Sequence, residues 1–196
     1  PFSNLDIGHR NALKIVLHDI GRLLKITCIL VSHEPQDVLS WADKIIVLKE
    51  GKIVQKGSPQ KIYREPVDEY VAGLFGIYNL IPNSSAPWLQ GRWRIKDNGS
   101  DMLVRPEDLK ITSSHRRSIS GKVTEVRYFG GYHEIDVDLG ELDVTVRYSK
   151  KKIEEGDEVY IRLSPNGVCY LPSEYAQAVP HLYVDVLDPS IQKMNN

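Results

Sequence analysis

Three adjacent polar residues, Ser32, His33 and Glu34, are the group in this sequence with the most direct capacity for chemistry. A serine, a histidine and a carboxylate build a nucleophilic triad only when their side chains converge in space. Neighbouring residues at the end of a strand point in different directions, so this trio cannot form one. A histidine at the carboxyl end of a strand can instead contact a ligand in the crevice of an open α/β sheet. His33 is therefore a candidate ligand contact.

The residues around His33 predict the elements that position it. Residues 26–31 form a short apolar run rich in β-branched side chains, which is typical of a strand buried on both faces. Pro35 then suits the first turn of a short helix. Residues 44–55 follow with two apolar runs around Gly51, which predicts a β-hairpin. The expected order is strand, polar tip, helix and hairpin.

Over residues 27–57 this order and its residues resemble the end of the nucleotide-binding domain of ABC transporter ATPases. In that family the histidine in the position of His33 is the switch histidine, which hydrogen-bonds the terminal phosphate of ATP. The D-loop of the same domain, which lies at the nucleotide site and the dimer interface, resembles Ser3, Asn4, Leu5 and Asp6. An amphipathic helix over residues 13–24 follows, and we expect one face of it to pack on a core. Asp6 can equally be a plain helix cap.

The resemblance implies that residues 1–76 are the C-terminal part of an ABC nucleotide-binding domain, an α/β remnant of a P-loop NTPase fold. The sequence has no Gly-x-x-x-x-Gly-Lys-Ser/Thr loop, whose backbone amides, lysine and hydroxyl hold phosphates and magnesium. It also has no Leu-Ser-Gly-Gly-Gln signature, and the family's catalytic glutamate would directly precede Pro1. We expect ATP and Mg²⁺ to be cofactors of the full-length protein only. This chain alone is not expected to be an enzyme.

Composition excludes several other classes of protein. The chain has 196 residues, 41% of them hydrophobic, and a net charge of −1 that lacks the positive field typical of nucleic-acid-binding proteins. Both cysteines, Cys28 and Cys169, lie in apolar runs and are expected to be buried thiols in a reducing compartment. No run approaches the roughly 18 apolar residues of a membrane span, and no signal peptide opens the chain.

From residue 77 the hydrophobic pattern changes from helical to alternating. We place a domain boundary near Gly76 and a linker over residues 82–87. Alternation on both sides of Gly140 predicts a β-hairpin. Further strands are expected at residues 93–95, 102–104, 119–128, 159–163, 168–171 and 182–186. Many short strands with glycine turns predict an all-β OB-like barrel over residues 77–196.

Residues 102–111 resemble the transport-associated OB (TOBE) domain of importer ATPases. The motif, which we expect to be structural or regulatory, is made of Arg105, Pro106, Glu107 and Asp108. This resemblance implies the C-terminal portion of the energy-coupling subunit of an ABC importer, a homodimer through its ATPase and TOBE domains. Such a subunit is cytoplasmic and attaches to the cell membrane through permease subunits; its substrate is left open. We expect an ion pair between Arg105 and Glu107 at the strand-to-turn connection.

One other function stays open on the sequence: a stand-alone OB-fold module that binds an oligonucleotide, an oligosaccharide or a small anion. Tyr128, Phe129 and Tyr132 would suit an interface or a stacking platform, or would cover the open end of the barrel. Basic runs at residues 115–117 and 150–152 are typical of solvated loops. No histidine has the spacing of a metal ligand, so no metal is expected.

Overall fold

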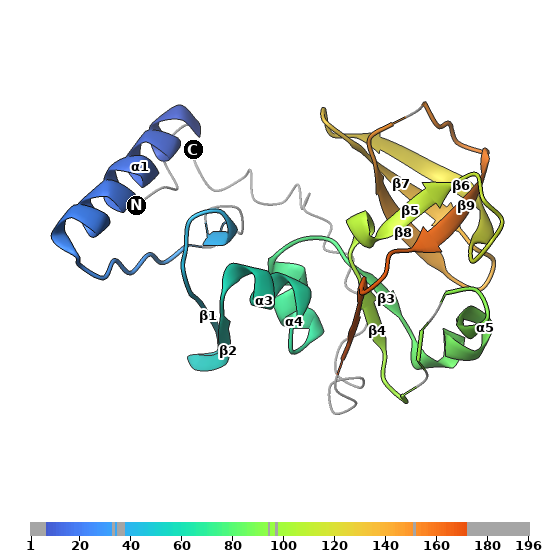
Figure 1. Ribbon diagram of the computed structural model, residues 1–196, viewed down its shortest axis with the longest axis horizontal. Coiled ribbons are helices and arrows are strands. Elements are labelled where there is room, and N and C mark those ends of the chain that lie inside the picture. Colours follow the sequence, from blue (N-terminus) through green and yellow to red (C-terminus); the bar gives the residue numbers. More distant parts are fainter. Residues whose placement is uncertain are drawn as a thin grey trace, which may run out of the picture.

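The computed structural model describes residues 7–32, 34, 38–93, 95–96, 98–150 and 152–171. Helix α1 (Ile7–Leu24) lies at one end and a strand-rich unit at the other (Figure 1). Two short helices, α3 (Pro59–Arg64) and α4 (Glu69–Leu74), lie between them. None of the described helices is long and apolar enough to cross a membrane.

Helix α1 forms as predicted, but its apolar face is open to solvent. Val16 is 51% exposed and Leu23 is 81% exposed, so the expected packing on a core is absent among the described residues. Residues 26–31 are not a strand, and Ile29 is 90% exposed. The predicted strand is wrong here because no other described strand lies beside it to form a ladder and cover its faces. Cys28 is exposed rather than buried for the same reason.

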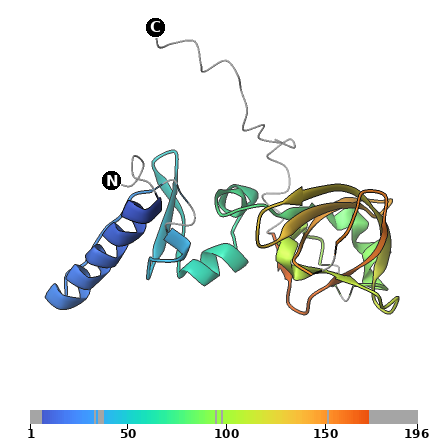
Figure 2. The same ribbon diagram turned by 90° about the horizontal axis from the view of Figure 1, so that it is seen from above.

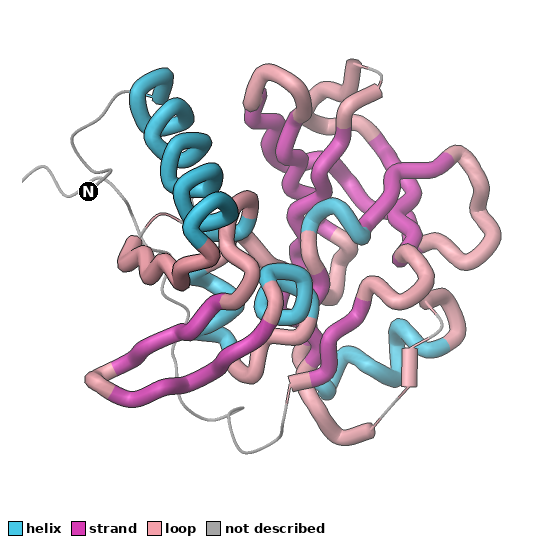
Figure 3. The backbone as a smooth tube through the Cα atoms, turned by 60° about the vertical axis from the view of Figure 1, so that its left-hand side comes forward, coloured by secondary structure: helices cyan, strands magenta, loops and turns pink. Residues whose placement is uncertain are grey.

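Strands β1 (Ile45–Lys49) and β2 (Lys52–Gly57) form the predicted antiparallel hairpin, drawn with its strands in magenta in Figure 3. Lys49 pairs with Lys52, which leaves Glu50 and Gly51 as a two-residue turn. Both turn residues have positive φ angles, 51° and 74°. A type I′ turn requires such angles, and glycine adopts them without a steric cost. The turn therefore has the residue type it needs at Gly51.

Each short helix after the hairpin begins at a side-chain cap. The Ser58 hydroxyl accepts the N–H of Lys61 at the start of α3, and the Asp68 carboxylate accepts the N–H of Val71 at the start of α4. These bonds satisfy N–H groups that have no partner within the helix. The helices share an apolar core with β1, made of Ile45, Val47, Ile62, Val71 and Phe75.

A three-stranded antiparallel sheet follows the helices. Its order is β10 (Val168–Tyr170), β4 (Met102–Val104) and β3 (Asn79–Ile81). All three residues of the central strand β4 are buried. Leu103 packs against Ala72 of α4 and against Leu171, directly after β10. Burial of these side chains fastens the sheet to α4.

Five further strands curl into a barrel, seen from above in Figure 2. Their order is β5 (Leu109–Thr112), β9 (Glu158–Leu163), β6 (Ile119–Tyr128), β7 (His133–Asp138) and β8 (Asp143–Tyr148), with every pairing antiparallel. The hairpin predicted around Gly140 is β7–β8. The turn η2 (Pro106–Asp108) connects β4 to β5. The β-rich, OB-like part of the predicted fold class is therefore confirmed, whereas the P-loop remnant stays a prediction.

The connection between β3 and β4 contains a helix, where a linker was predicted. The turn η1 (Asn83–Ser85) leads into α5 (Ala86–Gln90). Leu89 and Trp93 are buried in the barrel core, and Trp93 Nε1 donates to the carbonyl of Ile161 at 3.1 Å. The strand predicted at residues 93–95 is wrong, because Trp93 follows this helix in a turn and its side chain packs into the barrel core. The strand predicted at residues 182–186 lies outside the described residues.

Candidate functional site

The predicted site residues fall into two groups. The D-loop segment, residues 3–6, and His33 lie outside the residues that the structure describes. The motif Arg105-Pro106-Glu107-Asp108 is described, and its side chains meet α3, α4 and the barrel. The site that can be built from contacts is therefore the joint around Arg105.

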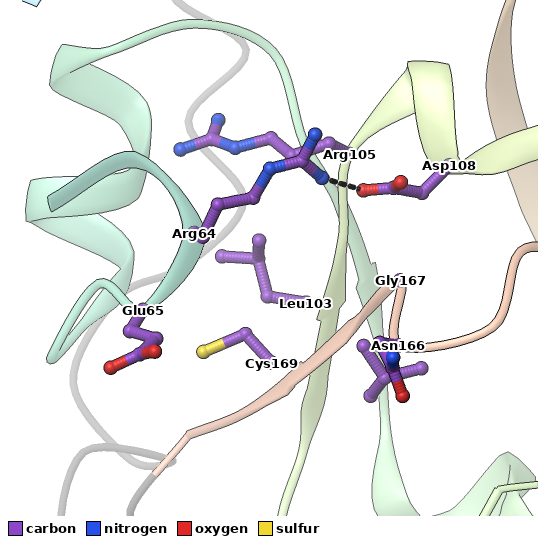
Figure 4. Close-up of a pocket in the computed structure, with 9 residues that line it drawn as sticks. Arg64, Glu65, Leu103, Arg105, Asp108, Asn166, Gly167 and Cys169 are labelled. Atoms are coloured by element: carbon purple, nitrogen blue, oxygen red, sulfur yellow. Dashed lines mark hydrogen bonds and ion pairs between the residues drawn. The ribbon is translucent and has the colours of Figure 1, made fainter. Parts of the chain in front are cut away.

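Arg105 follows β4 and carries its guanidinium between the two short helices and the three-stranded sheet (Figure 4). It is only 2% exposed. Nη1 donates to the carbonyls of Gly76 at 2.8 Å and Ile77 at 3.1 Å. Nη2 donates to the carbonyls of Ala72 at 3.1 Å and Tyr63 at 3.3 Å. These carbonyls belong to the last turns of α3 and α4 or follow α4, where helix carbonyls lack partners within the helix.

Backbone carbonyls are the direct hydrogen-bond partners of Arg105, and the carboxylate of Glu107 acts on its charge only from a longer distance. The carbonyl ends of two helices carry partial negative charge, and the Tyr63 ring lies 4.2 Å from the guanidinium carbon. Burial lowers the pKa of Arg105 from its ordinary value, yet an arginine remains charged at neutral pH. The predicted ion pair with Glu107 is wrong, because the guanidinium nitrogens bond to backbone carbonyls instead.

Glu107 belongs to a network that joins α3 to the barrel. The Tyr63 hydroxyl donates to Glu107 Oε1 at 2.7 Å. Arg147 Nη1 lies 3.8 Å from Glu107 Oε2, and Arg147 Nη2 donates to Glu134 Oε1 at 3.0 Å. Burial, together with the bond to the Glu107 carboxylate, raises the pKa of Tyr63 to about 12. The folded protein therefore holds this proton more tightly than a free tyrosine does, and the hydroxyl acts as a hydrogen-bond donor to Glu107.

Asp108 connects α3 to the loop between β9 and β10. Its carboxylate forms an ion pair with Arg64 of α3, marked by the dashed line in Figure 4. Burial raises the pKa of the Asp108 carboxyl and outweighs Arg64, which acts in the opposite direction. The carbonyl of Asp108 accepts the N–H of Ser164 at 2.8 Å. A Cβ added at Gly167 would lie 2.8 Å from Asp108 Cβ, so this close approach requires glycine.

A pocket of about 120 Å³ lies beside this joint and includes Cys169 in its wall. Burial raises the pKa of the Cys169 thiol, so this sulfur is protonated at neutral pH and is a poor nucleophile. The pocket is smaller than the roughly 300–1,000 Å³ of typical ligand pockets. Within the described part of the chain, no group of His, Cys, Asp and Glu side chains could hold a metal ion. The contacts of the joint connect α3, α4, the three-stranded sheet and the barrel.

Three members of this joint were not predicted from the sequence. Tyr63 and Arg64 contact residues 44 positions later in the chain, and no local pattern links such distant residues. Arg147 could have been found, because counting outward from the predicted turn at Gly140 places it opposite Glu134. The register of the hairpin could therefore have predicted the position of Arg147, whereas nothing in the sequence of α3 predicted the partners of Tyr63 and Arg64.

The aromatic residues at the tip of the β6–β7 hairpin face solvent. Tyr128 is 71% exposed and Phe129 is 51% exposed. Phe129 stacks on Tyr132 with ring centroids 5.4 Å apart, and Arg147 lies over the Tyr132 ring. Neither Tyr128 nor Phe129 joins the barrel core, so these two side chains do not cover the end of the barrel.

Comparison with known proteins assigns the part of the chain that contains this joint. Residues 102–171 match the family of TOBE domains. The spermidine/putrescine import ATP-binding protein PotA of Borreliella afzelii is 30% identical over 185 residues, which cover 89% of this chain and 53% of that protein. The protein of the same name from Desulfitobacterium hafniense is 32% identical over 182 residues, 86% of this chain and 51% of that protein. The chain belongs to the ATP-binding proteins of ABC importers.

It corresponds to the C-terminal part of such a protein and spans about half the length of the curated relatives it matches. The Fe(3+) ions import ATP-binding protein FbpC 1 of Pectobacterium atrosepticum is 25% identical over 186 residues, 89% of this chain and 53% of that protein. Among solved structures, the cytoplasmic molybdate-binding protein ModG aligns with 15% identity and a TM-score of 0.34, covering 45% of this chain and 71% of that one. A likeness that distant adds nothing to the assignment.

The TOBE match begins at Met102, the first residue of β4, and ends at Leu171. Arg105 and the three residues after it therefore belong to the TOBE domain. Tyr63, Arg64 and the carbonyls that Arg105 binds all precede it. The joint thus connects the TOBE domain of an importer ATP-binding protein to the segment in front of it.

Proposed function

We propose that this chain is the C-terminal portion of the energy-coupling subunit of an ABC importer. In the complete subunit, residues 1–76 finish the nucleotide-binding domain and residues 77–196 form a regulatory, dimerising TOBE domain. The observation that carries the proposal is the similarity to import ATP-binding proteins along 89% of the chain, beyond the TOBE domain alone. The substrate stays open between classes, because polyamine and iron import proteins are both similar.

The open apolar surface at the start of the chain supports this proposal. Val16, Leu23 and Ile29 lie on α1 and the segment after it, and all three are more than half exposed. Contiguous apolar surface of this kind is typical of a face that another segment covers. In the complete subunit we assign that cover to the remainder of the nucleotide-binding domain. Residues 26–31 would then gain the neighbouring strands that a buried strand requires.

His33 and the D-loop segment, residues 3–6, are the chain's contribution to ATP hydrolysis in this proposal. A neutral imidazole at His33 would donate one hydrogen bond to the terminal phosphate of ATP, and the D-loop would lie at the interface of two copies. ATP and Mg²⁺ would be held by the complete subunit. Permease subunits would place the homodimer at the cytoplasmic face of the membrane.

Substitution of His33 in the complete subunit tests the assignment of this residue. Because removal of one donor to a developing charge costs on the order of 10²-fold in rate, His33→Ala should lower the ATP turnover number by about that factor. His115→Ala is the matched control, since the His115 ring lies against Tyr160 of the barrel, with ring centroids 4.1 Å apart. Turnover by the His33→Ala subunit that equals the control would refute the role of His33.

A further inference from the structure

The chain contains two Asn-Gly pairs, Asn98-Gly99 and Asn166-Gly167. An asparagine before a glycine can react with its own backbone, because the nitrogen of the glycine can attack the side-chain carbonyl carbon and close a five-membered ring. Glycine favours this closure, since it has no Cβ to crowd the ring. The reaction needs a base that takes the proton of the glycine N–H, and it needs room for the two atoms to meet. The structure gives the two pairs different environments in both respects.

The pair Asn166-Gly167 lies in the turn before β10 and is restrained by its surroundings (Figure 4). The N–H of Gly167 donates to the carbonyl of Ser164 at 3.1 Å. Gly167 is buried, and a Cβ at this position would lie 2.8 Å from the Cβ of Asp108. Strand β10 begins with the next residue and pairs with β4. The nitrogen of Gly167 can therefore neither pass its proton to a base in solution nor move toward the side-chain carbonyl until this region opens.

The pair Asn98-Gly99 lies in the loop that leads from α5 to β4. Both residues are exposed, so a base in solution can reach them. The N–H of Ser100 donates to Asn98 Oδ1 at 3.2 Å, which turns the side-chain carbonyl back toward the backbone that follows it. A donor on a carbonyl oxygen also stabilises the negative charge that develops there when a nucleophile attacks the carbon. The bond from Ser100 therefore orients and polarises the carbonyl that the reaction requires.

We propose that Asn98 is a site of spontaneous deamidation and that the fold protects Asn166 from the same reaction. In the first step a base takes the proton of the Gly99 N–H, and the nitrogen bonds to Asn98 Cγ. The Cγ–Nδ2 bond then breaks, and Nδ2 takes up a proton and leaves as ammonia. In the second step one water molecule opens the ring at either of its two carbonyl carbons, which gives aspartate or isoaspartate. In sum, one water is consumed and one ammonia is released, without oxidation or reduction.

The modification adds one negative charge to a loop that Asp101 fastens to the rest of the fold. The carboxylate of Asp101 accepts the N–H of Asn83 at 2.8 Å, and its carbonyl accepts the N–H of Leu171 at 2.9 Å. Isoaspartate at position 98 also lengthens the backbone by one atom. Because the reacting pair is exposed and lies before this anchor, we expect the modified chain to stay folded.

The test follows both pairs in the 196-residue chain during incubation in mildly alkaline buffer, with and without a denaturing concentration of urea. Peptide mapping by mass spectrometry measures aspartate and isoaspartate at positions 98 and 166. Folding should slow the reaction at Asn166 at least about tenfold relative to urea, whereas it should slow the reaction at Asn98 less than about threefold. Each pair is its own reference, so the different neighbouring residues do not affect the comparison.

Two substitutions test the proposed chemistry at Asn98. Gly99→Ala adds a Cβ with no atom within 4 Å, and it should slow the reaction at Asn98 at least about tenfold by crowding the ring. Ser100→Pro removes the N–H that donates to Oδ1, and it should slow the same reaction at least about threefold. Both variants should leave the rate at Asn166 unchanged, which is the internal control. Circular dichroism checks that each variant is folded, and the comparison with urea needs no variant.

Three results would overturn the proposal. Reaction at Asn98 that folding slows as much as the reaction at Asn166 would refute the difference between the two pairs. Reaction at Asn166 that is as fast in the folded chain as in urea would refute its protection. A rate at Asn98 that Gly99→Ala leaves unchanged would mean that water, and not the backbone nitrogen, attacks the side chain.

Discussion

At the scale of single residues, the TOBE domain is held to the preceding segment by a buried positive charge. Arg105 is 2% exposed and bonds to the carbonyls of Tyr63, Ala72, Gly76 and Ile77. A buried charge is tolerated only when its donors are satisfied, and here the ends of two helices supply the acceptors. Removal of the guanidinium would break all of these hydrogen bonds at once, although the carbonyl of Ala72 would keep the N–H of Phe75 as a donor.

We therefore expect Arg105→Met to lower the free energy of unfolding by about 3 kcal/mol, since it breaks several buried hydrogen bonds together. The free energy of unfolding of Arg105→Lys should lie between those of Arg105→Met and the unsubstituted chain. Lysine keeps the charge, but its ammonium group cannot reach four separate carbonyls as the planar guanidinium does. Urea denaturation measures both values, with the exposed Arg92→Ala as a control. A loss below about 0.5 kcal/mol for the Met variant would show that Arg105 does not stabilise the joint.

Tyr63 makes the stability of the joint depend on pH in the alkaline range. Its pKa is about 12 in the folded protein, against about 10 for a free tyrosine, so the folded state holds its proton more tightly. The contribution is complete below pH 10 and is lost as pH rises from 10 to 12; it is on the order of 1–2 kcal/mol once solvent screening of this half-buried side chain is allowed for. The free energy of unfolding, measured by denaturation at several pH values between 10 and 12, should fall less steeply with pH for Tyr63→Phe than for the exposed Tyr128→Phe. Equal slopes would contradict the raised pKa.

At the scale of elements, local patterns predicted the parts of the fold whose signals are themselves local. Both hairpins follow from alternating residues around a glycine turn, at Gly51 and Gly140. The strand expected at residues 26–31 failed because a buried strand depends on neighbours that no local pattern provides. Helix α5 was missed because its turn-like residues conceal Leu89 and Trp93, which enter the barrel core from outside the sheet.

The candidate site divides in the same way. The motif from Arg105 to Asp108 was found from its sequence, but the partners of its side chains were not. The carbonyls that Arg105 binds lie 28 to 42 positions earlier in the chain. Such contacts depend on how α3 and α4 dock against the sheet, which is a property of tertiary packing. The residue types were predictable, and their pairing was not.

Strand β6 contains a glycine that the barrel requires for close packing. A Cβ at Gly121 would lie 2.6 Å from side-chain atoms of Leu139 and Val137 and 2.7 Å from the Asp138 carbonyl. Gly121→Ala should therefore lower the free energy of unfolding by about 2 kcal/mol through overpacking. Gly131→Ala is the matched control, because nothing lies within 4 Å of a Cβ at that position. Thermal unfolding of the two variants with equal midpoints would contradict this account.

At the scale of the whole molecule, the part around α1 and the β-rich part differ in how far they bury their apolar side chains. The β-rich unit from β3 to β10 buries its own core, which joins Leu89 and Trp93 to the barrel strands of the TOBE domain. By contrast, α1 and residues 26–31 expose large apolar side chains such as Leu23 and Ile29. A domain that buries its own apolar residues can fold alone, whereas an open apolar face requires cover. The proposal that the chain is part of a longer ATP-binding subunit explains this difference, because the rest of the subunit would cover the open apolar face.

Magnesium-dependent phosphate release from ATP tests that place most directly. We would measure it for the 196-residue chain and for the complete subunit proposed above. The account predicts no release above background from the 196-residue chain and steady turnover from the longer protein. Hydrolysis by the 196-residue chain alone, or none by the longer protein, would contradict it.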